Sequence, residues 1–122
     1  MSTKAAECWA SDPQARGLRI EISPERSLLL PFDEFAWAEL VSDGKEQQLK
    51  LVFAAHEVLV RGHTLRRIET AMQRMELSLL RKVPKEYRSV VEPGQAVILD
   101  IVVSEIQASA KGPAESPENL SN

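Results

Sequence analysis

The stretch that decides the fold is QLKLVFAAHEVLVRGHTLRRIETAMQRMELSLLRK, residues 48 to 82. Leu49, Leu51 and Phe53 alternate with other residues, which is typical of a half-buried strand. Val58 and Val60 repeat the alternation in the opposite phase. One straight strand would place one of the two sets in water, so the pattern predicts a turn or a bulge near residues 54 to 57. We favour two strands joined by a turn.

A glycine break and an amphipathic helix follow these strands. Gly62 suits a sharp strand-to-helix turn, and Thr64 is the expected N-cap. The apolar residues that follow share one side of a helix, which we predict for residues 64 to 74; they are Leu65, Ile68, Ala71, Met72, Met75 and Leu79. Residues 75 to 79 also alternate, which favours a short strand over 76 to 81 rather than a longer helix.

Three further segments read as strands or turns before the central stretch. Residues 18 to 22, LRIEI, alternate and predict a first strand, and Pro24 marks the turn after it. Residues 28 to 32 are expected to form a brief edge strand or a loop packed on the core. Residues 35 to 41 predict another strand, and Asp43-Gly44 is a hairpin signal that returns the chain antiparallel into residues 49 to 53.

The last predicted strand, AVILDIVVSEI, spans residues 96 to 106 and has apolar residues on both of its faces. This pattern is typical of a strand in the centre of a sheet. The chain is therefore expected to form an α+β domain, with a mostly antiparallel sheet of about five to seven strands and one amphipathic helix packed on one face. We expect one domain over residues 17–107, and flexible tails over residues 1–16 and 108–122.

Composition excludes several classes of protein. The 122 residues are 43% hydrophobic and 27% charged, as in ordinary soluble domains. No apolar run approaches the roughly 18 residues that a membrane-spanning helix needs, and the first residues do not resemble a secretory signal. Cys8 is the single cysteine, which excludes an internal disulfide and a four-cysteine zinc site. We expect a cytoplasmic protein without membrane partners.

The net charge of −3 hides an asymmetry along the chain. Residues 61 to 88 contain eight basic and three acidic residues, a net charge of +5. The other residues contain seven basic and fifteen acidic residues, a net charge of −8. A charge division of this kind indicates an interaction surface.

His56, Glu57 and His63 form the one cluster that resembles metal or acid–base chemistry. In an extended strand the two histidines would lie about 20 Å apart, so they could meet only if the strand folded back. Glycine motifs for phosphate or dinucleotide binding and the nucleophile elbow are not in the sequence. Asp100, on the last strand, is a candidate buried carboxylate, but an alternating strand more often points such a residue at solvent. The sequence therefore predicts no catalytic residue, no metal ligand and no cofactor, although it does not exclude an enzyme.

The basic segment supplies the candidate binding residues, which are Arg66, Arg67, Arg74 and Arg81. On a helix that reached residue 81, Arg67, Arg74 and Arg81 would form one row that could contact phosphates or an acidic protein. The segment has few aromatic residues to stack on bases, and the sequence pI of about 5.4 argues against strong non-specific binding to nucleic acid.

Three functions remain as hypotheses at this point. The first is a non-enzymatic protein-interaction or homo-oligomeric assembly module, whose partner is a second copy of the chain or an acidic protein. The second is binding of nucleic acid or a phosphate ligand by the basic helix face. The third is a small metal-dependent or acid–base enzyme that uses His56, Glu57 and His63.

Overall fold

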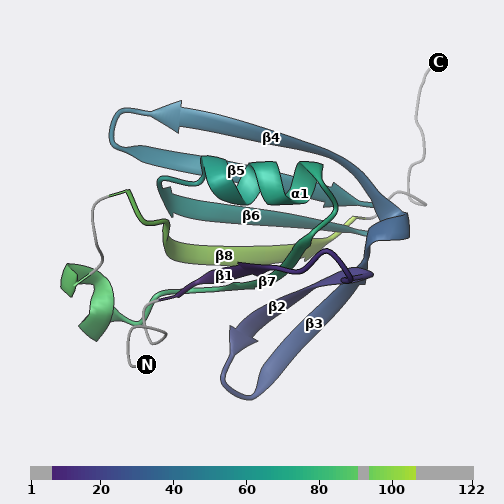
Figure 1. Cartoon of the computed structure of the whole chain (residues 1–122), viewed down its shortest axis with the longest axis horizontal. Coiled ribbons are helices and arrows are strands. Elements are labelled where there is room, and N and C mark those ends of the chain that lie inside the picture. Colours follow the sequence, from purple (N-terminus) through teal and green to yellow (C-terminus); the bar gives the residue numbers. More distant parts are fainter. Residues whose placement is uncertain (1–6, 91–93, 107–122) are drawn as a thin grey trace.

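The computed structural model describes residues 7 to 90 and 94 to 106. These residues form an α+β fold of eight strands in two four-stranded sheets, with one α-helix (Figure 1). All but one of the strand pairs are antiparallel. The predicted α+β class with mostly antiparallel pairing is therefore confirmed, although there are eight strands rather than five to seven and they are divided between two sheets. No helix in the described part of the chain is long and apolar enough to cross a membrane.

Sheet A has the strand order β1-β7-β2-β3 and sheet B the order β4-β5-β6-β8. The strands of sheet A are β1 (Trp9–Ser11), β2 (Gly17–Ser23), β3 (Arg26–Pro31) and β7 (Leu77–Arg81). The strands of sheet B are β4 (Phe35–Asp43), β5 (Glu46–Phe53), β6 (His56–His63) and β8 (Val97–Glu105). The helices are α1 (Arg66–Gln73) and the two 3-10 helices η2 (Phe32–Glu34) and η3 (Lys85–Val90).

The opposite phases of the central stretch produce two strands, as predicted. Strands β5 and β6 pair antiparallel around a turn at Ala54 and Ala55. The turn reverses the chain, so the odd positions of β5 and the even positions of β6 reach the same face, where Leu49, Leu51, Phe53, Val58 and Val60 are buried. The predicted hairpin is also present, because β4 and β5 are joined by Gly44 and Lys45, with Gly44 at a φ of 65°.

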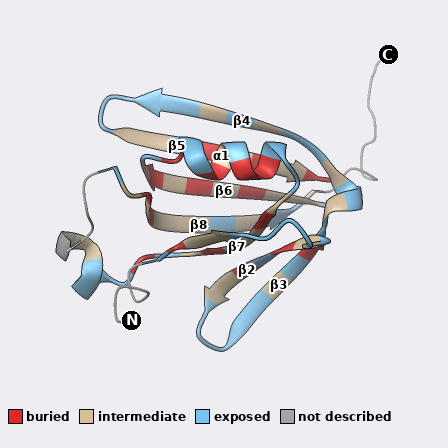
Figure 2. Cartoon of the chain, in the orientation of Figure 1, coloured by how far each residue is buried: buried red, intermediate tan, exposed pale blue. Residues whose placement is uncertain are grey.

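Helix α1 packs on this buried face of sheet B through one narrow side. Leu65, Ile68, Ala71 and Met72 are buried there, and the other side of the helix is exposed (Figure 2). Thr64 is not the N-cap, contrary to the prediction. The N-cap is Leu65 without a side-chain cap, and Thr64 has a φ of 59°. Gln47 provides the missing acceptor, because its Oε1 accepts a hydrogen bond from Leu65 N–H at 2.7 Å.

The helix ends at Gln73 because Met75 takes a left-handed conformation, with a φ of 57°. Met75 N–H donates to Met72 O, and Glu76 N–H donates to Ala71 O, which is the Schellman arrangement. The chain then enters β7, so the predicted strand over 76 to 81 is confirmed. The apolar side predicted for the helix is wrong at its last two residues, because Met75 is 40% exposed and Leu79 lies in strand β7.

Residues 7 to 16 belong to the fold, which corrects the expected tail over 1–16. Strand β1 pairs with β7, and Cys8 beside it is buried. Strand β1 pairs with a strand that is distant in sequence, so no pattern within residues 7 to 16 predicts this pairing. Residues 1 to 6 and the tail expected over 108–122 lie outside the described residues.

Strand β8 is an edge strand of sheet B rather than a central one, which corrects the prediction. Its register against β6 shifts between Arg61 and Gly62, so that Leu99 has no partner in the ladder. The extra residue is a β-bulge, which changes the face to which later side chains point. Apolar residues on both sides of β8 therefore reflect the bulge and the exposure of Val102, not burial between two neighbouring strands.

Gly62 is required at this bulge. A Cβ atom on Gly62 would lie 1.9 Å from Val97 O, far inside any real contact distance. Gly62 therefore allows close approach of the two backbones and lets β6 continue to His63, whereas the sequence predicted that it would close the strand.

Candidate functional site

The histidine cluster is separated by the fold. His56 and His63 are the first and last residues of β6, which runs between them without folding back. His63 Nδ1 donates to Lys45 O at 2.7 Å, and Lys45 lies in the turn between β4 and β5. Within the described residues no group of three His, Cys, Asp or Glu side chains is placed to hold a metal ion. This arrangement does not support a shared site for His56, Glu57 and His63.

The four candidate arginines lie on different elements. Arg66 and Arg67 begin α1 and Arg74 follows its last residue, and all three are exposed. Arg81 lies in β7, where its Nη1 is 3.5 Å from Glu21 Oε1 and its Nε donates to Glu7 O at 3.0 Å. Because the helix ends at Gln73, the single row of arginines that a longer helix would produce does not form.

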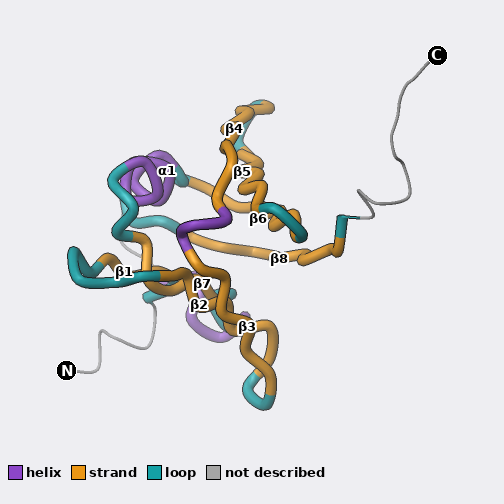
Figure 3. Tube along the Cα trace, turned by 90° about the vertical axis from the view of Figure 1, so that its right-hand side faces the viewer, coloured by secondary structure: helices purple, strands orange, loops and turns teal. Residues whose placement is uncertain are grey.

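The outer face of sheet B, opposite α1, carries a band of apolar side chains. Figure 3 shows α1 beside one side of the sheet, and no described element covers the other side. We define the apolar band as Trp37, Val52, Leu59 and Val102, which follow one another through direct or diagonal neighbours in the strand register. Trp37 is 50% exposed and Val102 is 48% exposed.

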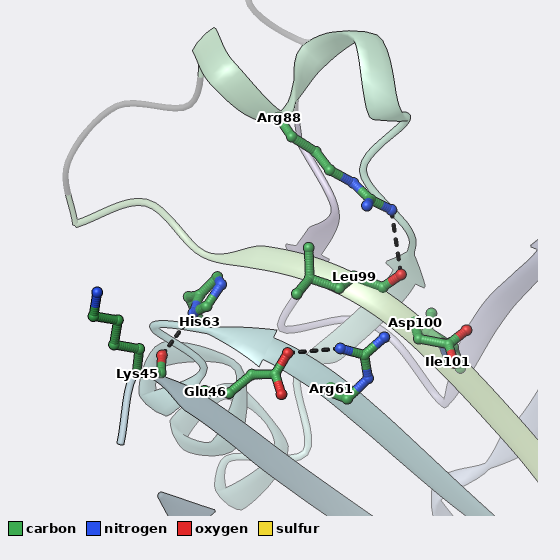
Figure 4. A network of polar contacts seen from close by, with 8 residues as sticks. All are labelled: Lys45, Glu46, Arg61, His63, Arg88, Leu99, Asp100 and Ile101. Atoms are coloured by element: carbon green, nitrogen blue, oxygen red, sulfur yellow. Dashed lines mark hydrogen bonds and ion pairs between the residues drawn. The ribbon is translucent and has the colours of Figure 1, made fainter. Parts of the chain in front are cut away.

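Charged residues flank the apolar band on the same face. Lys50 Nζ lies 5.8 Å from the centre of the Trp37 ring, within the range of a cation–π contact. Arg61 Nη1 lies 2.6 Å from Glu46 Oε2 (Figure 4). Asp100 is opposite Arg61 in the register and is half-buried, and its Oδ1 accepts a hydrogen bond from Ile101 N–H. Asp100 is thus part of this flank and not a deeply buried carboxylate.

Strand β4 gives sheet B an open edge. It spans nine residues, and among the strands of the described residues it pairs on one side only, with β5. Trp37 and Val41 are both about half exposed along it. The other edge of the sheet is partly closed, because Val83 N–H donates to Ile98 O of β8. Sheet A has two edge strands, β1 and β3, which are both shorter than β4. Strand β1 spans three residues, and β3 ends in Pro31, a residue that blocks further pairing.

A basic groove lies between the β2–β3 turn and the segment from β7 to η3. Its volume is about 660 Å³. Ile22, Pro24, Val83 and Pro84 supply apolar lining. Its charged lining residues are Glu21, Arg81, Lys82, Lys85 and Arg88. Four cations therefore face one carboxylate, and that carboxylate is already paired with Arg81.

Arg88 is held in a fixed position beside this groove. Its Nε donates to Val83 O at 3.1 Å. Its Nη2 donates to Leu99 O at 3.3 Å (Figure 4). Leu99 is the bulged residue of β8, which leaves its carbonyl outside the register with β6. Both acceptors are uncharged, so these contacts orient the guanidinium without neutralising it.

Cys8 is not a candidate nucleophile. It is 1% exposed, and its Sγ donates to Ala96 O at 3.4 Å. Burial raises the pKa of the Cys8 thiol from 9.0 to about 11. A thiol that stays protonated at neutral pH is a weak nucleophile, so Cys8 packs as a small apolar residue.

Comparison of the chain with protein-family models, with curated proteins and with solved structures found no match. The candidate sites therefore come from the geometry of the chain itself.

Sequence reasoning missed the residues that the structure groups together. Trp37 and Val41 alternate along a predicted strand, but nothing in that pattern shows that the strand lies at an edge. Lys82, Lys85 and Arg88 belong to the basic segment that the charge count identified. The opposite wall of their groove comes from residues 21 to 24, which are far away in sequence.

Proposed function

We propose that the chain is a non-enzymatic protein-interaction domain that self-associates through the open edge of β4. The unpaired edge of β4, with half-exposed Trp37 and Val41 beside it, is the observation that carries the proposal. Such an edge presents unpaired backbone N–H and C=O groups that another strand can bind. A second copy of the chain offers the same edge, and two copies related by a twofold axis pair antiparallel.

The residues along β4 support a second copy as the occupant. Strand β4 contains neither proline nor lysine, the residues that commonly protect an edge from pairing. Trp37 and Val41 point to the same face, so each copy contributes apolar area beside the new strand pair. Glu39 lies between them, and Lys50 is its partner on β5. The positive charge of Lys50 offsets the repulsion between the Glu39 carboxylates of the two copies.

One strand edge buries less than the roughly 1,600 Å² of a standard protein–protein interface. We therefore expect association that depends on protein concentration. An acidic protein at the exposed arginines of α1 is the alternative partner, and nucleic acid at the same arginines is the alternative ligand.

Two matched variants test the proposal. Val41→Lys places a charge at the β4 edge, and Val102→Lys places the same charge on the same face at the opposite edge of the sheet. Both valines are 48% exposed, so each change should alter the free energy of unfolding by no more than about 0.5 kcal/mol. Size-exclusion chromatography with light scattering, over a range of concentrations, reports the molar mass.

The expected result is a dimer for the wild type and for Val102→Lys, and a monomer for Val41→Lys. Loss of the dimer in both variants would place the contact on the sheet face instead of the edge. A monomeric wild type at every concentration contradicts self-association. Absorbance at 260 nm in the same run reports bound nucleic acid, and high salt would remove a ligand held by charge.

A further inference from the structure

We propose that the basic groove binds a small organic phosphate, a phosphate monoester with an apolar body. The groove is bounded by the β2–β3 turn on one side and by the segment from Arg81 to Arg88 on the other. Figure 1 shows η3 beyond the end of β7 and far from β4. The site is thus separate from the edge proposed for self-association, and the two proposals can fail independently.

The charge of the groove favours an anion. Lys82, Lys85 and Arg88 line it, and within residues 7–90 and 94–106 none of them has a carboxylate partner. Arg81, the fourth cation, is already paired with Glu21. Three cations exceed what the single charge of a carboxylate would balance. A phosphate monoester carries a charge of about −1.5 to −2 near neutral pH and offers three acceptor oxygens, so it matches the set better.

Arg88 gives the groove a preorganised contact. Two of its three guanidinium nitrogens are occupied by the carbonyls of Val83 and Leu99, and Nη1 has no partner among the described residues. The charge therefore stays in place before a ligand arrives, and less side-chain entropy is lost on binding. Arginine also suits phosphate geometrically, since its planar donors match the phosphate oxygens.

The position of Arg88 depends on the bulge in β8, and therefore on Gly62 in the central stretch of the sequence. Gly62 permits the close approach of β6 and β8, the register shifts there, and Leu99 is left without a partner. The Leu99 carbonyl then accepts the hydrogen bond that orients Arg88. One glycine in the central stretch thus positions a cation in a groove on another part of the molecule.

The remaining lining sets the size and polarity of the ligand. Ile22, Pro24, Val83 and Pro84 give the groove apolar walls. A volume of about 660 Å³ lies within the range of roughly 300 to 1,000 Å³ that small-molecule sites show. Inorganic phosphate alone would leave these walls in water, so the body of the ligand should be apolar.

A titration of the full chain with phenyl phosphate tests the proposal, with inorganic phosphate and benzoate as comparison ligands. Nuclear magnetic resonance spectra of the ¹⁵N-labelled protein report which amides respond. We expect saturable shifts confined to residues 21 to 24 and 81 to 88, and phenyl phosphate should bind at least about tenfold more tightly than either comparison ligand. Binding should weaken as salt is added, because the cations are solvent-accessible.

Two variants and one matched control complete the test. Arg88→Gln should weaken phenyl phosphate binding at least about tenfold, and thermal unfolding shows whether the fold survives. Lys85→Gln changes an exposed residue and should weaken binding several-fold without affecting the fold, so the proposal stays testable if Arg88→Gln unfolds. Arg66→Gln, on α1, should bind like the wild type. The titration extends to about 10 millimolar phenyl phosphate, which would detect binding with a Kd of that order. If the groove residues show no saturable shifts at that concentration, the proposal is overturned. If Arg66→Gln weakens phenyl phosphate binding as much as Arg88→Gln does, the proposal is overturned as well, since binding would then depend on the net charge of the protein and not on the groove.

Discussion

Replacing Gly62 by alanine places a methyl group against the backbone of β8. The new Cβ would lie 1.9 Å from Val97 O and 3.0 Å from Val97 C, whereas an ordinary contact begins at 3.4 Å. One of the two strands must therefore move by about 1.5 Å. Both contacts are with backbone atoms, so no flexible side chain can rotate away to relieve the clash.

The cost of this displacement follows from the bonds around Gly62. Moving β8 disturbs its pairing at Gly62 and His63 and the hydrogen bond from Val83 N–H to Ile98 O. Each lost hydrogen bond costs about 0.5–1.5 kcal/mol, and overpacking costs about 1–3 kcal/mol. We expect Gly62→Ala to lower the free energy of unfolding by about 3–5 kcal/mol, a large share of the roughly 5–15 kcal/mol of a natural domain. The Tm should fall by about 12 °C or more.

Urea and thermal denaturation followed by circular dichroism measure this loss. Gly44→Ala is the matched control, because Gly44 has a φ of 65° and a Cβ added there would meet no atom within 4 Å. The control isolates the cost of a left-handed conformation, about 1–2 kcal/mol. If Gly62→Ala loses no more stability than Gly44→Ala, the steric argument for the bulge is wrong.

Two further predictions concern the left-handed turn after α1 and the buried thiol. Met75→Gly should raise the free energy of unfolding by about 0.5–1 kcal/mol, because Met75 is 40% exposed and has a φ of 57° that glycine adopts without strain; an unchanged or lower urea midpoint would contradict this. Cys8 should react slowly with a thiol reagent at pH 8 and rapidly in urea, and immediate labelling of the folded protein would refute its burial. Because the pKa of Cys8 is raised from 9.0 to about 11, its protonated form stabilises the fold fully below pH 9, and this contribution is lost as the pH rises through that interval. A Cys8→Ala variant should therefore lose less stability than the wild type between pH 9 and 11.

Local patterns predicted the elements whose cause is local. The two phases of residues 49 to 60 required a turn, and Asp43-Gly44 required a hairpin; both are present. The end of α1 was harder to locate, because the left-handed position that usually holds glycine holds Met75. The alternation of residues 75 to 79 nevertheless indicated the strand that follows.

Features that depend on distant partners could not be predicted in the same way. Strand β1 has three residues and is stabilised by pairing with β7, more than sixty positions later. Strand β8 resembles a central strand in sequence because the bulge at Leu99 shifts its phase. The arginines of the basic segment were predicted as one group, but Arg81 pairs with Glu21 of β2, whereas Arg66 lies on α1. The charge of a segment can be read from the sequence, while the surface on which each charge lies depends on the topology.

Hydrogen exchange of the β4 amides tests self-association through this edge most directly. About half of these amides point away from β5, and in an isolated chain they exchange with water at once. If β4 pairs with a second copy, these amides become protected as the protein concentration rises, and Val41→Lys removes the protection. Rapid exchange of the same amides at every concentration, in a wild type that light scattering shows to be dimeric, would contradict pairing through β4 and place the interface elsewhere.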